Sequence, residues 1–330
     1  MIFYQMGKVM EKMLSTKKTD APTLAVLLPC YNEEAAISSV IKAFQQALPN
    51  AQIYVCDNNS SDTTAAEALA AGATVLTEAR RGKAYAVQHL FQHVEADIYI
   101  LCDGDLTYDE AAAPKMIACL LEKKSGMVVG VRCPKEGQKT FRPGHGFGNF
   151  AFTAMMRLFF GGELKDVLSG YRVFSRAFVK SFPILSSGFD IEVEMTAHAL
   201  ATGVGVAEMK TDYFERAEGS LSKLKTFKDG AIIAGTFMRL VIDFQPLKVF
   251  TATAALQIMI AFWLFEPVLR EYLETGFVDR LPTAILCLGL VVMGMYTGFI
   301  GVILDSICRQ RLEVKKLAFL SMASSEKEND

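Results

Sequence analysis

Short apolar runs alternate with helix-like stretches in the first half of the chain. Two helical patterns extend from Glu33 to Ala47 and from Thr63 to Ala71. Five apolar runs surround them: LAVLLP (24–29), QIYVC (52–56), TVLT (from Thr74), DIYILC (97–102) and GMVVGV (near Met127). Runs that are apolar on both faces and alternate with helices are typical of a parallel sheet covered by helices. The pattern therefore predicts an α/β fold with a mostly parallel sheet.

Two much longer apolar stretches occupy the second half. No charged residue occurs from Val249 to Phe265 or from Leu281 to Leu304. A helix needs about 20 such residues to cross ~30 Å of hydrocarbon, and Pro246–Leu247 and Pro267–Val268 extend the shorter stretch. The glycine-rich sequence GLVVMGMYTGFIG suits close helix packing in lipid. We expect a transmembrane hairpin, with a buried helical hairpin of a soluble domain as the alternative.

The charges that flank these stretches predict their orientation. The connecting sequence EPVLREYLETGFVDR has more acidic than basic residues, whereas Arg309, Arg311, Lys315 and Lys316 follow the second stretch. Basic residues favour the cytoplasmic side of a membrane. We therefore expect a multi-pass protein of the cytoplasmic (inner) membrane, with the large N-terminal domain and both termini in the cytoplasm.

The segment before the first span, KTFKDGAIIAGTFMRLVIDF, has apolar residues at helical spacing and three interspersed basic residues. Its position favours an interfacial helix that lies on the headgroups, and an ordinary amphipathic core helix is the alternative. The expected organisation is a lead-in (1–22), a soluble domain (23–226), an interfacial helix (227–245), two spans (about 247–268 and 281–304, within 246–306) and a basic tail (307–330).

Composition narrows the class of protein. Of 330 residues, 51% are hydrophobic, and the net charge is only −2, so nothing in the overall charge indicates nucleic-acid binding. Seven cysteines occur without a CxxC pair, and Cys30, Cys56 and Cys102 adjoin the ends of apolar runs. Buried free thiols are expected, which argues for the cytosolic side and against a disulfide scaffold or a zinc site.

Polar side chains follow three of the apolar runs, in PCYNEE, DNNSSD and DGDLT. Ligands of parallel sheets bind at the carboxyl ends of the strands. Asp103 and Asp105 are separated only by Gly104, and carboxylates so close repel each other. A divalent cation removes this repulsion, and Mg²⁺ and Mn²⁺ accept carboxylate, water and phosphate oxygens as ligands. DGDLT therefore indicates a metal–diphosphate site.

Two alternatives for DGDLT stay open. One is a solvated turn with an Asp that caps a helix, as expected for Asp109 before EAAAPKMIACLLEK. The other is the D-x-D-x-T motif of haloacid-dehalogenase-type phosphatases, in which Asp103 would be the nucleophile and Asp105 a general acid. That family opens its domain with this strand, whereas two βα units precede it here.

The ordered set of motifs resembles the family-2 glycosyltransferases with the GT-A fold. LLPCYNEEAAI, VCDNNSSDTT, RRGKAYA and DGDLT follow the order and spacing of that family. FRPGHGFGN, DVLSGYRVFSR, GFDIEVEM and ERAEGSLSKLKTFKDG, followed by two spans, are similar to the polyprenyl-phosphate glycosyltransferases, the group of dolichyl-phosphate mannose synthase and its bacterial membrane-anchored relatives. The resemblance covers about residues 23 to 310. It implies a Rossmann-like GT-A domain followed by an interfacial helix and a transmembrane hairpin.

The resemblance also implies a donor site. Its residues would be Pro29, Tyr31 and Glu33 along the nucleotide, Asp57 at the base or ribose, Lys83 near the nucleotide, and Asp103 and Asp105 on a Mg²⁺ or Mn²⁺ ion at the diphosphate. This chain departs from the family twice. Asn58 stands where a second Asp often occurs, and Thr107 stands where many relatives carry Gln, which leaves the third metal ligand open.

An acceptor that carries a phosphate requires cations. The resemblance places phosphate-binding residues at Arg132, Arg142, Arg216 and Lys223. Guanidinium groups match phosphate geometry with paired hydrogen bonds.

The expected groups at the reaction centre are Asp105, Arg132, Asp166 and Arg216. Asp166 is expected to orient Arg172 or the acceptor rather than to abstract a proton. Glu192 and Glu194 face one side at strand spacing or straddle a helical turn, and a structural role is equally open for both.

The activity implied by the resemblance is inverting transfer of one sugar from a nucleotide sugar, a UDP-sugar in our hypothesis, to a polyprenyl phosphate. The expected partners are the donor, the lipid acceptor and the bilayer, and the resemblance allows a homotetramer. The alternatives are a membrane-anchored phosphatase and a non-catalytic scaffold that binds nucleotide sugars.

Overall fold

A computed structural model of the chain describes residues 22–134, 153–154, 157, 164–184, 191–214, 235, 238 and 241–329, with side chains to residue 322. The chain forms two compact units. One comprises Met1–Lys223 and Lys315–Asp330, and the other comprises Leu224–Val314. The expected lead-in 1–22 lies almost entirely outside the described residues.

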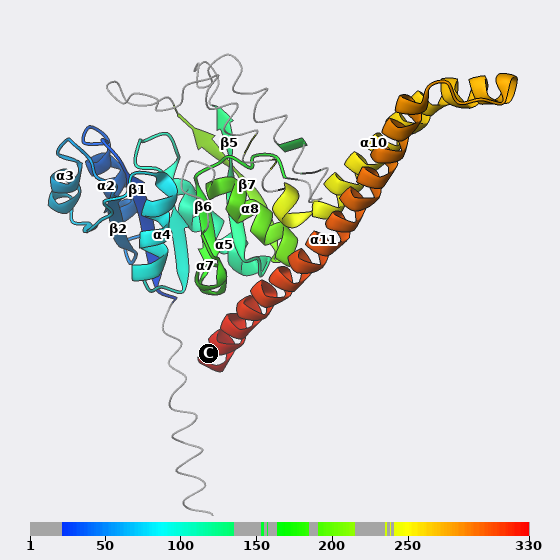
Figure 1. Ribbon diagram of the computed structural model, residues 1–330. Helices are drawn as coiled ribbons and strands as arrows, with labels where there is room; N and C mark the ends of the chain where they lie inside the picture. Colours follow the sequence, from blue (N-terminus) through cyan, green and yellow to red (C-terminus); the bar gives the residue numbers. More distant parts are fainter. Residues whose placement is uncertain are drawn as a thin grey trace, which may run out of the picture. The chain divides into compact units, whose positions relative to one another are not determined.

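In the described part of the first unit, seven strands form one sheet in the order β3-β2-β1-β4-β6-β5-β7 (Figure 1). They are β1 (Leu24–Cys30), β2 (Gln52–Asp57), β3 (Thr74–Thr77), β4 (Ile98–Leu101), β5 (Met127–Pro134), β6 (Arg172–Ser175) and β7 (Val206–Tyr213). Only β6 runs antiparallel to its neighbours, β4 and β5. The mostly parallel sheet confirms the predicted fold class.

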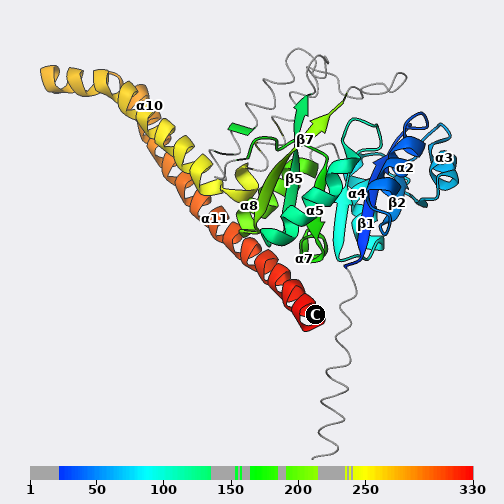
Figure 2. The same cartoon turned by 180° about the vertical axis from the view of Figure 1, so that it is seen from behind.

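Helices cover both faces of this sheet, which Figures 1 and 2 show from opposite sides. They are α2 (Ile37–Ala47), α3 (Thr64–Ala70), α4 (Lys83–His93), η1 (Glu110–Ala112), α5 (Ala113–Glu122), α7 (Arg176–Ser181) and α8 (Ile191–Thr202). Alternate residues of β1 point into two different cores: Val26 and Leu28 pack with α2 and α5, and Ala25 and Leu27 pack with α4, α7 and α8. A central strand buried on both faces explains why its sequence is apolar without alternation.

One predicted helix start differs from the structure, and one predicted helix cap is confirmed. The helix expected from Glu33 begins at Ile37, after a turn in which the backbone N–H groups of Ala36 and Ile37 both donate to the carbonyl of Glu33. The Asp109 carboxylate accepts a hydrogen bond from the backbone N–H of Ala111, so the predicted cap is confirmed at η1.

All seven cysteines are free, and five of them are buried, as expected for a protein without a disulfide framework.

The second unit contains a hairpin of two long helices, α10 (Pro246–Thr275) and α11 (Leu281–Asn329), of which α11 belongs to this unit as far as Val314. Gly276, at φ 74°, ends α10 in the left-handed conformation that glycine adopts without strain. The helices pack closely at glycines of α11: a Cβ atom added at Gly301 would lie 2.6 Å from the Cβ of Phe250, and one at Gly294 would lie 2.9 Å from Cγ1 of Ile258. This packing fits the glycine-rich sequence that suggested it.

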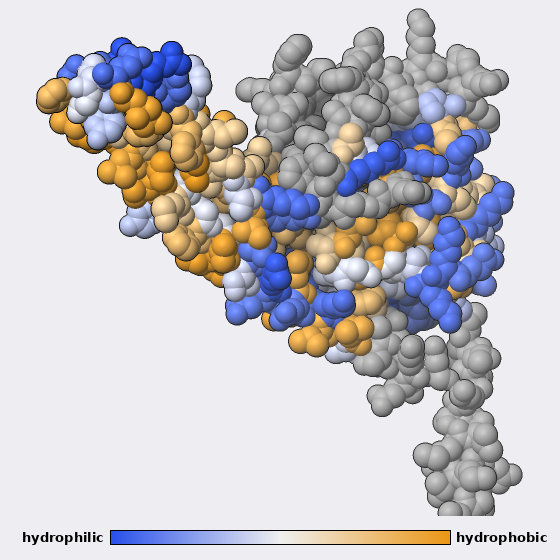
Figure 3. All heavy atoms as spheres, turned by 90° about the vertical axis from the view of Figure 1, so that its right-hand side faces the viewer, coloured by the Kyte–Doolittle hydropathy of each residue, from blue (hydrophilic) through white to orange (hydrophobic). Residues whose placement is uncertain are grey.

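Both hairpin helices are long and apolar enough to cross a membrane, and few of the residues in their apolar windows are buried (11% in α10, 17% in α11). Large apolar side chains such as Phe262, Trp263 and Phe299 are exposed. Figure 3 shows hydrophobic surface along most of the hairpin and hydrophilic surface at its turn. This exposure disfavours a buried hairpin of a soluble domain.

The segment expected as a basic tail, 307–330, continues α11 as far as Asn329. Arg309 forms an i,i+4 ion pair with Asp305, a spacing that supports a helix. Residues 235, 238 and 241–244 of the expected interfacial segment are helical, Gln245 is the non-helical residue before α10, and the others lie outside the described residues.

Candidate functional site

The loops after β1, β2 and β4 meet because these strands are neighbours in the sheet. The backbone N–H of Asn58, after β2, donates to the carbonyl of Cys30 at the end of β1 (2.8 Å). The Asn32 side chain, after β1, accepts a hydrogen bond from the backbone N–H of Ser61 (2.8 Å). The three polar sequences that follow the apolar runs therefore form one edge, as predicted.

The turn after β4 places Asp105 next to a residue with a strained backbone, Leu106. The Asp105 carboxylate accepts hydrogen bonds from the hydroxyl (2.6 Å) and the backbone N–H (3.3 Å) of Thr107. Leu106, between them, has φ 59°, which a leucine rarely adopts. A Cβ atom at Gly104 would lie 2.6 Å from Sγ of Cys30, so the turn requires glycine there. Thr107, which replaces the Gln of relatives, thus holds the second carboxylate of the motif.

Lys83, the first residue of α4, joins two carboxylates. Its ammonium lies 2.5 Å from Oδ1 of Asp103 and 2.5 Å from Oε1 of Glu192 on α8. Burial by itself would lower the pKa of Lys83, but the two carboxylates outweigh burial and raise the pKa above its usual value. A Cβ atom at Gly170 would lie 2.7 Å from Oδ2 of Asp103. The cluster is therefore charged and closely packed.

This cluster fits a divalent cation whose other ligands come from water or phosphate. Asp103, Asp105 and Glu192 together with Lys83 carry a formal charge of two minus. Within the described residues, no three His, Cys, Asp or Glu side chains are grouped so that they could hold a metal alone. Mg²⁺ commonly uses one or two carboxylates plus substrate phosphates. The donor set matches that pattern.

Asn58 fixes the loop that leads into α4. Its amide group donates to the carbonyls of Glu78 (3.2 Å) and Arg80 (2.6 Å), and its oxygen accepts from the backbone N–H of Gly82 (2.7 Å). An Asp at this position has no N–H to donate. The departure from the family pattern therefore has a structural role, which is to position the loop before Lys83.

The remaining donor-site residues of the sequence analysis lie along the same edge. Pro29 is the penultimate residue of β1, and Asp57 is the last residue of β2. Glu33 and Asp57 are each 8% exposed. The Arg81 guanidinium lies over the ring of Tyr31, 5.2 Å from its centre.

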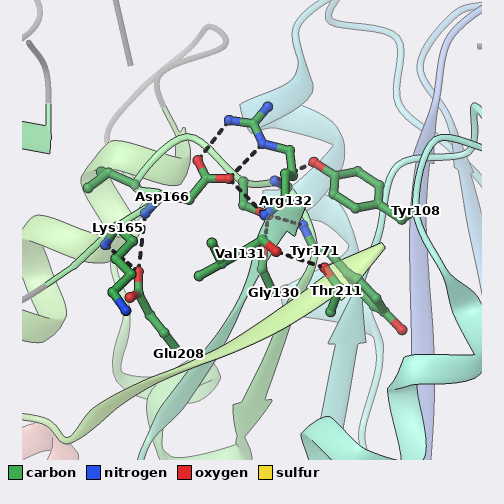
Figure 4. Close-up of polar contacts among 12 residues, drawn as sticks. Tyr108, Gly130, Val131, Arg132, Lys165, Asp166, Tyr171, Glu208 and Thr211 are labelled. Atoms are coloured by element: carbon green, nitrogen blue, oxygen red, sulfur yellow. Dashed lines mark hydrogen bonds and ion pairs between the residues drawn. The ribbon is translucent and has the colours of Figure 1, made fainter. Parts of the chain in front are cut away.

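Arg132, on β5, and Asp166 form an ion pair (Figure 4), and the two side chains are 8% and 5% exposed. Nε and Nη2 of Arg132 each donate to an Asp166 oxygen at 2.7 Å, and the backbone N–H of Arg132 adds a bond of 3.1 Å. Burial would raise the pKa of Asp166, but the bonds from Arg132 outweigh it and hold that pKa below its usual value. Of the two expected partners of Asp166, Arg172 and the acceptor, Arg172 is not the one bonded to it, because Asp166 pairs with Arg132; a role towards the acceptor stays a prediction.

Arg172 is fully buried and bonded to neutral groups instead. Its guanidinium donates to the carbonyls of Val167 (2.6 Å) and Ser169 (2.9 Å) and to the hydroxyl of Thr196 (2.9 Å). Burial lowers its pKa to about 10. This residue ties the start of β6 to the preceding loop and to α8.

Several residues at the site carry no signal that the sequence analysis used. The hydroxyl of Tyr108 accepts a hydrogen bond from the backbone N–H of Gly170 (2.9 Å). The Arg132 guanidinium lies over the ring of Tyr213, 5.6 Å from its centre. Glu208 bonds to backbone groups of the loop that contains Asp166 (Figure 4). Their positions depend on strand pairing, so a local motif does not reveal them.

Three of the expected acceptor residues, Arg142, Arg216 and Lys223, lie outside the described residues. Glu192 and Glu194 lie on α8, so the helical alternative holds for them, and both are buried. The structure therefore brings Arg132 and Asp166 together but leaves the rest of the acceptor set as an expectation.

Comparison with known proteins identifies a family and several similar proteins. The model of the family "Glycosyl transferase family 2" matches residues 25–182. Glycosyltransferase AglJ of Haloferax volcanii is 32% identical over 216 residues, which are 64% of this chain and 69% of that protein. A dolichyl-phosphate hexose transferase of the same organism is 27% identical over 220 residues (67% of this chain, 94% of that protein).

A solved structure shares the fold. It is glucosyl-3-phosphoglycerate synthase from Mycobacterium tuberculosis, in complex with Mn²⁺, UDP and glucosyl-3-phosphoglycerate. The TM-score is 0.54 at 22% identity, and the match covers 69% of this chain and 81% of that one.

Proposed function

The chain belongs to glycosyl transferase family 2, and from that premise we propose that it transfers one sugar from a UDP-sugar to a polyprenyl phosphate at the cytoplasmic face of the membrane. The product would be a polyprenyl-phosphate-linked sugar with inverted anomeric configuration. The observation that carries the acceptor assignment is the exposed apolar hairpin formed by α10 and α11. A transferase with a soluble acceptor has no need of such helices.

The donor assignment is supported by the cluster at the carboxyl ends of the strands. Asp103 and Asp105 would hold a divalent cation, which would neutralise charge on the diphosphate. Lys83 would place a second positive charge beside it, because its ammonium already lies against Asp103. The mycobacterial relative of known structure binds Mn²⁺ and UDP, which favours a uridine donor with Mn²⁺ or Mg²⁺.

The acceptor assignment has support from residue chemistry as well. Arg132 is a buried cation held in one orientation by Asp166 and by the ring of Tyr213. Guanidinium groups suit phosphate recognition. A relative that the chain covers over 94% of its length is a dolichyl-phosphate hexose transferase, so a polyprenyl phosphate is the acceptor class with a known counterpart.

A phosphate acceptor needs no general base. The second pKa of a phosphate monoester is ~6, so an oxyanion is already present at neutral pH. That oxygen would form a bond to the anomeric carbon while the bond from this carbon to the donor diphosphate breaks, and the electron pair would leave with UDP. Asp166 would not accept a proton, because both of its oxygens accept hydrogen bonds from Arg132.

The test uses purified full-length protein in detergent with undecaprenyl phosphate and Mn²⁺ or Mg²⁺. UDP-glucose, UDP-galactose, UDP-N-acetylglucosamine and GDP-mannose are supplied separately, and lipid products are identified by mass spectrometry. We expect a mass gain of one hexose or hexosamine with a UDP-sugar. EDTA should abolish it, and Asp105→Asn should reduce it by about 100-fold or more, the scale on which single electrostatic groups act in transfer reactions.

The same assay separates the alternatives. Release of inorganic phosphate without a glycosylated lipid would contradict the proposal and favour the phosphatase. Binding of UDP-sugars without any product, under all donors and metals, would favour the scaffold. Family membership supports neither outcome.

A further inference from the structure

A carboxylate on β7 holds the start of the loop at residues 164–171, which is called here the positioning loop. Oε1 of Glu208, on β7, accepts hydrogen bonds from the backbone N–H groups of Lys165 (2.7 Å) and Asp166 (3.2 Å). Figure 4 shows Glu208 reaching the loop from β7. Hydrogen bonds to an ionised acceptor are about twice as strong as neutral ones. One oxygen thus orders two consecutive peptide groups.

Hydrogen bonds of Arg172 and Ser169 hold the other end of the positioning loop. The Arg172 guanidinium binds the carbonyls of Val167 and Ser169. The Ser169 hydroxyl donates to the carbonyl of Gly130 on β5 (2.6 Å). The backbone of the loop is therefore fixed at both ends.

Two parts of the site depend on this backbone. Asp166, at its start, accepts three hydrogen bonds from Arg132. Gly170, near its end, packs against Asp103 and Lys83. The loop therefore touches the acceptor cation at one end and the metal-site cluster at the other.

We propose that Glu208 is a positioning residue for the acceptor: it fixes the peptide groups at 165–166 so that Asp166 presents the Arg132 guanidinium to the acceptor phosphate. This inference rests on the proposed function. β7 pairs with β5, which carries Arg132, and Glu208 is opposite Val129 in that pairing. Glu208 and Arg132 therefore lie on two paired strands, and the positioning loop contacts both residues. A glutamate that is only a solvated surface residue would not accept hydrogen bonds from two consecutive backbone N–H groups.

The test compares Glu208→Ala with Glu208→Gln in the full-length protein. The Gln side chain retains an oxygen that can accept both backbone hydrogen bonds, whereas Ala does not. Lys210→Ala is the matched control, because Lys210 is an exposed residue on the same strand. The kinetic readouts are KM for undecaprenyl phosphate and KM for the donor. The structural readout is hydrogen–deuterium exchange of the peptide that contains residues 164–168.

For Glu208→Ala we expect KM for undecaprenyl phosphate to rise roughly tenfold and the donor KM to change less than about twofold, since the loss of such hydrogen bonds corresponds to a factor of about ten. Exchange at 165 and 166 should accelerate by at least about tenfold for the same reason. Glu208→Gln and Lys210→Ala should resemble the wild type.

Three results would overturn the proposal. They are unchanged acceptor KM and exchange in Glu208→Ala, equal increases in both KM values, and a Gln variant as impaired as the Ala variant. If the wild type transfers no sugar to undecaprenyl phosphate, the proposed function fails by itself. The exchange comparison then still decides whether Glu208 orders the loop: acceleration in Glu208→Ala alone supports that anchor, and equal exchange refutes it.

Discussion

At the scale of residues, the charges at the site are already paired within the protein. The repulsion expected between Asp103 and Asp105 indicates that a divalent cation binds between them or beside them. The structure shows that Lys83 compensates part of it, because the ammonium lies against Asp103, while Thr107 holds Asp105 by hydrogen bonds. A divalent ion would then meet carboxylates whose positions are fixed in advance, which is the arrangement that electrostatic catalysis requires.

The sequence indicated residues of this site but not their partners. Asp103, Asp105 and Lys83 were found from motifs and Arg132 from the family resemblance, and their roles stay predictions. The partner of Asp166 was not found, because Arg172 is close to it in sequence, whereas Arg132 is 34 positions away and reaches it only through the sheet. Pairing across a sheet is a tertiary property that a linear motif does not contain.

Asn58→Asp tests the role of the loop before Lys83. The carboxylate cannot donate to the carbonyls of Glu78 and Arg80, so the buried loop would lose two hydrogen bonds. We expect the donor KM to rise and the thermal midpoint in detergent to fall by several degrees, the consequence of about 1–3 kcal/mol of lost stability.

Asn59→Asp is the matched control for that variant. The Asn59 amide is exposed and makes only a 3.4 Å contact with the carbonyl of Ala79. The donor KM and the thermal midpoint should therefore stay close to the wild-type values in the control. Equal behaviour of the two variants would show that the Asn58 amide does not hold the loop.

At the scale of elements, apolar patterning predicted the strands that contain a continuous apolar run and missed two strands that do not. β1 and β2 end one residue beyond their predicted limits. The four-residue β6 and the alternating β7 lacked a continuous apolar run, so they were not predicted. The place of β6 between β4 and β5 follows from packing of the whole sheet. The helix expected to end near Leu304 continues because helix-favouring residues follow it.

Gly301→Leu tests the packing of the hairpin. A Cβ at Gly301 would already lie 2.6 Å from that of Phe250 on α10, so a leucine would force the two helices apart. We expect the thermal midpoint in detergent to fall by several degrees, since overpacking typically costs about 1–3 kcal/mol. The control is Gly289→Leu, because an added Cβ there meets no atom within 4 Å. A hairpin that tolerates both changes equally is not packed at Gly301.

At the scale of the whole molecule, the chain joins a family-2 glycosyltransferase domain to a pair of exposed apolar helices. The domain accounts for the sugar donor, and the helices account for a lipid-bound acceptor in our proposal. Confinement of enzyme and lipid to one surface would raise their effective concentration. The interfacial helix, the orientation of the spans and a homotetramer stay predictions, because they depend on residues or partners outside the described structure.

The measurement that tests this account most directly is a comparison of acceptors. Purified full-length protein, Mn²⁺ and the active UDP-sugar are given undecaprenyl phosphate, undecaprenol or 3-phosphoglycerate, and each product is identified by mass spectrometry. The account predicts a glycosylated product with undecaprenyl phosphate alone, because the lipid anchors the acceptor and its phosphate supplies the nucleophile. Transfer to 3-phosphoglycerate, or to undecaprenol as readily as to its phosphate, would contradict it.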